Sequence, residues 1–146
     1  MALPLLVGTL LIASGSVASA GTKHLTCPAA TAVNTASGGS FGAPKFGSAF
    51  AGSGYCTYKA STGGKTLTVA YSKLGKQNFA KLAKTEAGKH DHISSVSGVG
   101  QSAVHGSGPL DVLFVHQGSS IYEVLDNTKQ ATVPQLVAVA KLIVPA

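Results

Sequence analysis

The chain has 146 residues, a length typical of one domain with a modest core, and a formal net charge of +6 at pH 7. All eleven basic side chains are lysines, and arginine is absent. Because arginine makes bidentate hydrogen bonds to phosphates and to guanine edges, its absence argues against a nucleic-acid-binding protein. Scattered lysines favour solubility and a salt-sensitive attraction to anionic polymers or lipid head groups.

Residues 1–20 form an apolar segment that ends in Ala18-Ser19-Ala20, and polar residues follow from Gly21. An apolar core that closes on a small-x-small tripeptide is the pattern of a signal peptide and its cleavage site. Glycines and hydroxyl residues interrupt the segment, whereas a spanning helix needs roughly 20 continuous apolar residues. We therefore expect a signal peptide over residues 1–20 and a single secreted domain over residues 21–146, with no stable transmembrane span after cleavage.

Two cysteines, Cys27 and Cys56, are present. In an oxidising compartment an isolated pair predicts one disulfide, and its spacing does not fit a metal site of the C-x-x-C type. The alternative, a nucleophilic cysteine, would need a thiol that stays reduced outside the cell. A lipid anchor on Cys27 is disfavoured because the preceding His24-Leu25-Thr26 lacks small residues.

A short helix is predicted to begin near Thr26 as its N-cap, to accept Pro28 in its first turn and to end at Ala36. Residues 37–54 are then predicted to form a loop, because glycine, serine and alanine dominate there.

Three phenylalanines lie in this loop, at Phe41, Phe46 and Phe50. Aromatic side chains in a small domain either pin a loop onto the core or form an exposed binding surface. We expect two of them to pin the loop and Phe46, which lies between Lys45 and Gly47, to be the exposed one.

The first hairpin is predicted from residues 55–61 and 66–72, because two runs rich in threonine, tyrosine and valine flank Gly63-Gly64. In the second run Leu67, Val69 and Tyr71 alternate with smaller residues. One face of this strand is therefore expected to be buried and the other to be wet or lightly covered.

Helical periodicity follows over Lys76 to Ala87, with Gly88 as its stop. Short strands are predicted at 93–96 and 102–105, and Gly98 and Gly100 are predicted to form a tight turn between them. A second hairpin is predicted from 110–117 and 120–126, and a last helix from Thr132. The predicted fold is α+β: an antiparallel sheet built from two hairpins, covered on one face by helices, with one disulfide.

Several short stretches together resemble a known family. They are Cys56-Thr57-Tyr58, the strand from Thr66 to Tyr71, the helix around Phe79, the stretch from Val96 to Ala103, and the closing hairpin with its alanine-rich helix. This set resembles an actinobacterial extracytoplasmic domain of unknown function, whose members are mostly lipoproteins or secreted proteins with paired cysteines and a G-L-G-D-x-A turn. The chain departs from that pattern at Gln101, where the family has an acidic residue, and in lacking a lipobox and arginine. The resemblance implies a fold and a location rather than a reaction.

His90 and His92 are the candidate metal ligands, because imidazoles at i and i+2 can bind zinc or copper together with a third ligand. His105 or His116, on neighbouring predicted strands, would have to supply that ligand. The alternative is that both histidines are simply solvated in a polar loop.

No pattern of catalytic residues stands out, since the serines lack a G-x-S-x-G elbow and the five carboxylates form no recognisable pair. The glycines at 98 and 100 also do not extend into a dinucleotide motif. We therefore expect a non-catalytic envelope protein without a cofactor. Its expected ligand is a partner protein, an anionic polymer or a small apolar molecule bound near Phe41, Phe46 and Phe50, and the alternative is a metal-binding protein or metal-dependent enzyme that uses His90 and His92.

Overall fold

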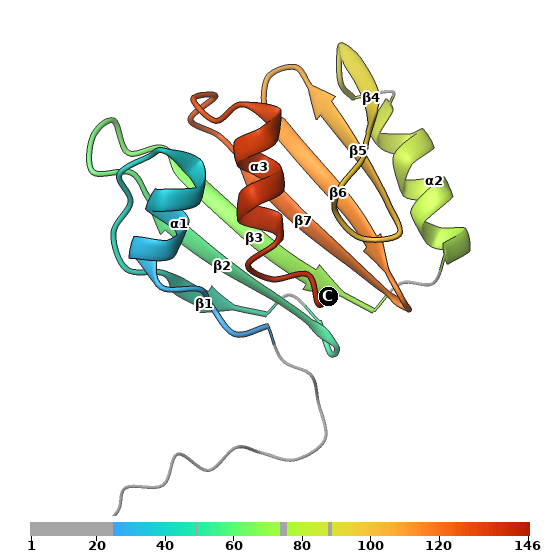
Figure 1. The fold of residues 1–146 in the computed structure, drawn as a ribbon, viewed down its shortest axis with the longest axis horizontal. Helices are drawn as coiled ribbons and strands as arrows, with labels where there is room; N and C mark the ends of the chain where they lie inside the picture. The colour runs from blue at the N-terminus through green and yellow to red at the C-terminus, as the bar shows by residue number, and fades with distance from the viewer. Residues whose placement is uncertain (1–24, 49, 74–75, 88) are drawn as a thin grey trace, which may run out of the picture.

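The computed structural model of the protein describes residues 25–48, 50–73, 76–87 and 89–146. The predicted signal peptide, the predicted domain start at Gly21 and the helix stop at Gly88 lie outside the described residues. The described residues form a seven-stranded antiparallel sheet in the order β1-β2-β3-β7-β6-β5-β4, together with three helices (Figure 1).

The helices are α1 (Ala30–Ser37), α2 (Lys76–Ala87) and α3 (Val133–Ala140). The strands are β1 (Lys45–Gly47), β2 (Ser53–Lys59), β3 (Thr66–Ser72), β4 (His92–Val96), β5 (Ser102–Ser107), β6 (Asp111–Gln117) and β7 (Ser120–Asp126). The predicted α+β class is confirmed, and both predicted hairpins are present as β2–β3 and β6–β7. Because β7 pairs with both β3 and β6, the two hairpins join at the centre of the sheet.

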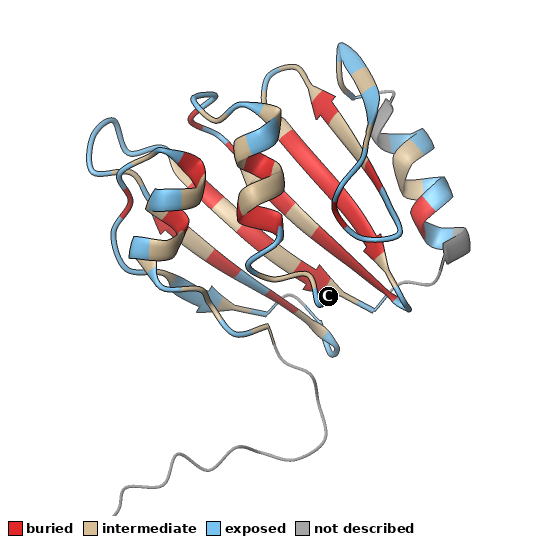
Figure 2. Cartoon of the chain, in the orientation of Figure 1, coloured by how far each residue is buried: buried red, intermediate tan, exposed pale blue. Residues whose placement is uncertain are grey.

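One face of the sheet packs against α1 and α3, and we call it the helix-pair face. It carries Leu67 and Val69 of β3, as predicted from their alternation, and Val124 of β7. These side chains pack with Val33 of α1 and Leu136 of α3, and all five are fully buried. Figure 2 shows the buried residues concentrated in the central strands, so the core lies between the middle of the sheet and this pair of helices.

The opposite face, which carries Thr68 and Ala70 of β3 and Ile121 of β7, is called the open face. Here α2 lies over β5 and β6 and buries Phe79 against Val112 and Phe114. Helical cover is thus present on both faces, but on the open face it is confined to one side of the sheet.

The first helix begins at Ala30, and the prediction that Thr26 caps it is wrong. Two contacts draw the preceding segment against β2 instead: the confirmed Cys27–Cys56 disulfide, and a 2.7 Å hydrogen bond from the Tyr58 hydroxyl to the Pro28 carbonyl. A chain held in this way is extended up to Ala29, whose φ of -60° and ψ of 144° place the N-cap there.

The segment predicted as a loop over residues 37–54 contains β1 and the beginning of β2. Phe46 of β1 pairs with Cys56, and Lys45 pairs with Thr57. The β1 strand satisfies backbone groups along the outer edge of β2, a tertiary requirement that composition does not reveal.

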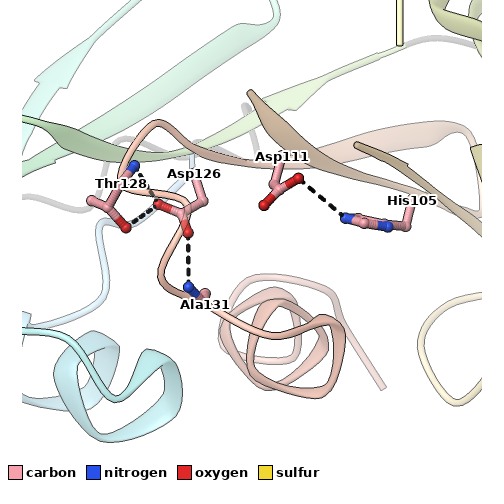
Figure 3. Close-up of polar contacts among 5 residues, drawn as sticks. All are labelled: His105, Asp111, Asp126, Thr128 and Ala131. Carbon is pink, nitrogen blue, oxygen red and sulfur yellow. Dashed lines mark hydrogen bonds and ion pairs between the residues drawn. The ribbon is translucent and has the colours of Figure 1, made fainter. Parts of the chain in front are cut away.

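A buried carboxylate fixes the connection from β7 to α3 (Figure 3). Asp126 is fully buried and accepts hydrogen bonds from the backbone N–H groups of Thr128 at 2.8 Å and Ala131 at 3.0 Å, and from the Thr128 hydroxyl. These hydrogen bonds offset the cost of removing a polar carboxyl group from water. The helix then begins after Thr132, as predicted, and the Gln135 side-chain carbonyl accepts from the Thr132 backbone N–H at 2.8 Å.

The predicted tight turn between β4 and β5 is confirmed, with φ values of 85° at Gly98 and 59° at Gly100. A Cβ atom at Gly100 would lie 2.7 Å from the carbonyl oxygen of His116, so only glycine fits. The turn buries Val99 in the helix-pair core, which extends the cover of that face toward β5.

Replacement of Phe114 by alanine tests the central position of the β6–β7 hairpin. Phe114 is 4% exposed on β6 beneath α2, so Phe114→Ala should lower the free energy of unfolding by about 3 to 5 kcal/mol. Urea denaturation measures this loss, and Phe46→Ala, at a side chain 57% exposed, is the matched control with an expected change below about 1 kcal/mol. Equal shifts of the two midpoints would contradict the placement of Phe114.

Alkaline pH should weaken the attachment of the N-terminal segment. Burial raises the pKa of Tyr58 from 10.0 to about 12, and burial also raises the pKa of Tyr122. An unfolded tyrosine loses its proton near its usual pKa of about 10, whereas folded Tyr58 keeps its proton until the higher value is reached. Stability is therefore retained below the unfolded pKa and falls as the pH rises through this window, by about 2 kcal/mol for Tyr58.

Urea denaturation as a function of pH measures this decline. The Tyr58→Phe variant loses the hydrogen bond to Pro28, at a cost of about 1 kcal/mol near neutral pH. Above the unfolded pKa its stability should decline less steeply than that of the wild type, because the titrating group is gone. Parallel curves for the two proteins would show that Tyr58 does not titrate in this way.

Candidate functional site

A cleft lies on the open face where the cover provided by α2 ends. Its volume is about 260 Å³, and we call it the Phe50 cleft. Its apolar lining comes from Phe50, Tyr55, Ala70, Leu82 and Ile121. Because Leu82 belongs to α2 and the others to the sheet or the turn before β2, the cleft depends on three parts of the chain that are distant in sequence.

Few polar groups face this cleft, and the side chains among them are those of Ser53, Ser72 and Glu123. Glu123 lies opposite Ala70 on the neighbouring strand and is half-buried. The cleft therefore combines an apolar floor with one carboxylate, a composition that suits binding and orientation of an apolar ligand rather than covalent chemistry.

Phe50 is held at the rim of the cleft by its own turn. The Ser53 backbone N–H donates to the Phe50 carbonyl at 3.1 Å, and the Ser53 hydroxyl accepts from the Phe50 N–H at 3.0 Å. The Ser48 hydroxyl donates to the Ser53 carbonyl at 3.0 Å, and Gly52 supplies the positive φ of 80° that the turn requires. The exposed ring is thus attached to an ordered backbone, which lowers the entropy lost on binding.

The structure separates the three phenylalanines. Phe41 is buried in the helix-pair core and Phe46 is 57% exposed, as predicted for each. Phe50 is also 57% exposed, so the expectation that two rings pin the loop is wrong. Phe46 lies against Gly54 and Leu25 on the helix-pair face, away from the Phe50 cleft, and the two exposed rings do not form one surface.

A second cavity, of about 270 Å³, continues along the open face beside β7. It shares Glu123 with the Phe50 cleft and is lined by Val112, Phe114, Leu125 and His90, among other residues. The side chains of Ile121, Glu123 and Leu125 follow one another along this face of β7, so the two cavities lie in sequence along the strand.

The candidate metal ligands do not converge on one point. His90 lies against Gly106, on the open face, whereas His92 is exposed on the edge strand β4 opposite Ser107. Among the described residues, no group of three or more histidine, cysteine, aspartate and glutamate side chains is arranged to hold a metal ion.

The other two candidate ligands lie on opposite faces of the sheet. His105 faces Asp111, with 3.9 Å between Nε2 and Oδ1, on the helix-pair face (Figure 3). His116 is buried on the open face, where its ring centroid lies 5.5 Å from that of Phe79. Neither can complete a site with both His90 and His92.

Sequence reasoning missed most residues of the Phe50 cleft. Leu82 and Ile121 match the periodicity of buried positions, and nothing in their pattern indicates a cavity. One sequence feature did indicate the position of the cleft. The face of β3 that carries Ala70 is predicted to be wet or lightly covered, and the cleft lies on that face.

No family model, curated protein or solved structure matches this chain. Within the part of the chain that the structure describes, none of the helices is both long and apolar enough to cross a membrane.

Single phenylalanine replacements should distinguish a ring that holds the loop against the core from a ring that lies exposed at the edge of the cleft. Phe41→Ala removes a buried ring and should lower the free energy of unfolding by about 3 to 5 kcal/mol. Phe50→Ala removes an exposed ring and should change it by less than about 1 kcal/mol. Thermal and urea denaturation of the two variants measure these differences, and a large loss for Phe50→Ala would mean that Phe50 supports the core.

Proposed function

We propose that the chain is a secreted, non-catalytic protein of the cell envelope that binds a small apolar ligand in the Phe50 cleft. Binding is supported by the cleft itself, an apolar depression on the part of the open face that α2 does not cover. When a ligand covers apolar side chains that were exposed to water, the complex is stabilised by about 25 cal/mol for each Å² of apolar surface buried.

Secretion is supported by two features at the start of the chain. The apolar segment 1–20 has the pattern of a signal peptide, and the Cys27–Cys56 disulfide is the kind of bond that persists in oxidising compartments. The resemblance to actinobacterial extracytoplasmic domains agrees with the same location and belongs to this proposal.

The size of the cleft limits the ligand. A volume of about 260 Å³ is just below the usual range of ligand pockets, roughly 300 to 1,000 Å³. It suits a small ligand, such as two linked ring systems or a short acyl chain. A longer chain would continue past Glu123 into the second cavity along β7.

Filling the cleft provides the test. The Ala70→Phe variant places a ring on the cleft floor, and it should weaken binding of the neutral apolar fluorophore N-phenyl-1-naphthylamine by at least about tenfold, equal to about 1.4 kcal/mol. Fluorescence titration measures the affinity. The matched control is Thr62→Phe, which adds the same ring to the exposed turn between β2 and β3 and should leave binding unchanged.

Three outcomes would contradict the proposal. They are no saturable binding to the wild type, equal binding to both variants, and binding that persists in Ala70→Phe while its unfolding midpoint matches the wild type. A partner protein whose capture is lost in Phe50→Ala but unchanged in Ala70→Phe would show that Phe50 belongs to a protein–protein interface.

A further inference from the structure

The lysines and the carboxylates are separated along the chain. Eight of the eleven lysines precede Glu86, and none of the five carboxylate side chains does. The net positive charge of the protein therefore originates in its N-terminal part, which contains α1, β1, β2, β3 and most of α2.

In the folded protein, several of these lysines lie on neighbouring strands. The strands β1, β2 and β3 are consecutive at one edge of the sheet, on the side away from α2 (Figure 1). Lys45 lies opposite Thr57 and is a diagonal neighbour of Lys59, and strand alternation places both on the open face. Lys65 directly precedes the Lys59–Thr66 pair and lies opposite Ala60, at the end of β2 and β3 where the turn joins them. All three lysines are exposed, and together we call them the lysine face.

The described carboxylates lie elsewhere. Asp126 is buried and hydrogen-bonded, and Asp111 faces His105 on the helix-pair face. Asp91 precedes β4 at the opposite edge of the sheet, and Glu123 belongs to the Phe50 cleft. No described carboxylate comes from β1, β2 or β3, so the lysine face is cationic without a neutralising group on its own strands.

Protection of the sheet edge accounts for only part of this arrangement. A lysine on a short edge strand such as β1 discourages pairing with another chain. Lys59 is on β2, an internal strand, and Lys65 is in a turn, so edge protection requires neither of them.

Threonine hydroxyl groups lie on the open face beside Lys45 and Lys59. Thr57 and Thr68 lie opposite each other with 3.5 Å between their hydroxyl oxygens, and Thr66 lies opposite Lys59. Tyr55, on the same side of β2 where the Phe50 cleft begins, is 37% exposed. Hydroxyls both donate and accept hydrogen bonds, and an exposed aromatic ring offers an apolar surface to the C–H groups of a sugar.

We propose that the lysine face binds an anionic polysaccharide, with its carboxylate or phosphate groups on Lys45, Lys59 and Lys65 and its hydroxyls on the threonines of β2 and β3. A linear anionic polymer matches the positive charge of these exposed lysines. The absence of arginine disfavours nucleic acid as the occupant, because bidentate phosphate and base contacts are missing. This site lies beside the Phe50 cleft and does not depend on a ligand there.

Binding to polygalacturonate, with neutral dextran as the uncharged reference polymer, tests the proposal on the full domain. The wild type should bind polygalacturonate at low ionic strength and progressively less as salt screens the charges, and it should not bind dextran. The triple variant Lys45→Gln, Lys59→Gln, Lys65→Gln should bind about tenfold more weakly, because it removes the three positive charges that the polymer is proposed to contact.

A second triple variant, Lys81→Gln, Lys84→Gln, Lys141→Gln, removes the same net charge from exposed positions on α2 and after α3. It should retain affinity within about threefold. Urea midpoints close to the wild-type value in both triple variants exclude unfolding as the cause of any loss.

Several results would overturn the proposal. These are no binding to polygalacturonate at low salt, an equal loss in both triple variants, and tighter binding to single-stranded DNA or to vesicles containing phosphatidylglycerol than to the polysaccharide. Binding of N-phenyl-1-naphthylamine by the lysine variants is an independent measurement. Its retention alongside lost polymer binding would support two separate sites, and failure of either assay alone identifies which proposal is wrong.

Discussion

The structure depends on one constraint: a seven-stranded sheet has two faces to cover, and the described chain provides three short helices to cover them. The helix-pair face receives α1, α3 and the turn that buries Val99, and its central strands present mainly aliphatic and tyrosine side chains to this core. On the open face, large apolar side chains such as Phe114 occur in the central strands, and α2 lies near them. Toward β2 and β3 the open face carries threonines, which do not require burial. The Phe50 cleft lies at the boundary between these two regions.

The position of α3 depends on a buried polar group, the Asp126 carboxyl, as well as on apolar packing. After β7 the chain must reverse direction and cross the helix-pair face as α3, and the Asp126 carboxylate organises this turn through Thr128 and Ala131. Replacement of such a group leaves buried N–H donors unpaired, at a cost of about 1 to 3 kcal/mol each. The position of α3, and with it the burial of Leu136 on the helix-pair face, therefore rests on a carboxylate in the core.

Local patterns in the sequence predicted much of the fold. Alternation over β3, the Gly-Gly turn, the helical period of α2 and the start of the last helix near Thr132 each depend on a few neighbouring residues, and each prediction is confirmed. The start of α1 and the strand β1 were missed because a disulfide and an unpaired edge, both long-range features, decide them. Among the candidate site residues, the exposure of Phe46 followed from its polar neighbours. The exposure of Phe50 could not be predicted in this way, because it depends on the turn that the hydrogen bonds among Ser48, Phe50 and Ser53 stabilise.

The two proposed binding regions differ in how far they are coupled to stability. Leu82 and Ile121 line the Phe50 cleft and also pack in the cluster that holds α2 against the sheet. Substitutions that reshape the cleft therefore also alter the attachment of a helix, and the size of an accepted ligand is constrained by packing. Lys45, Lys59 and Lys65 are exposed and make no contribution to either core cluster. Their charge is therefore free to vary with little effect on folding, and the proposed polymer binding can be tested without changing the packing of either cluster.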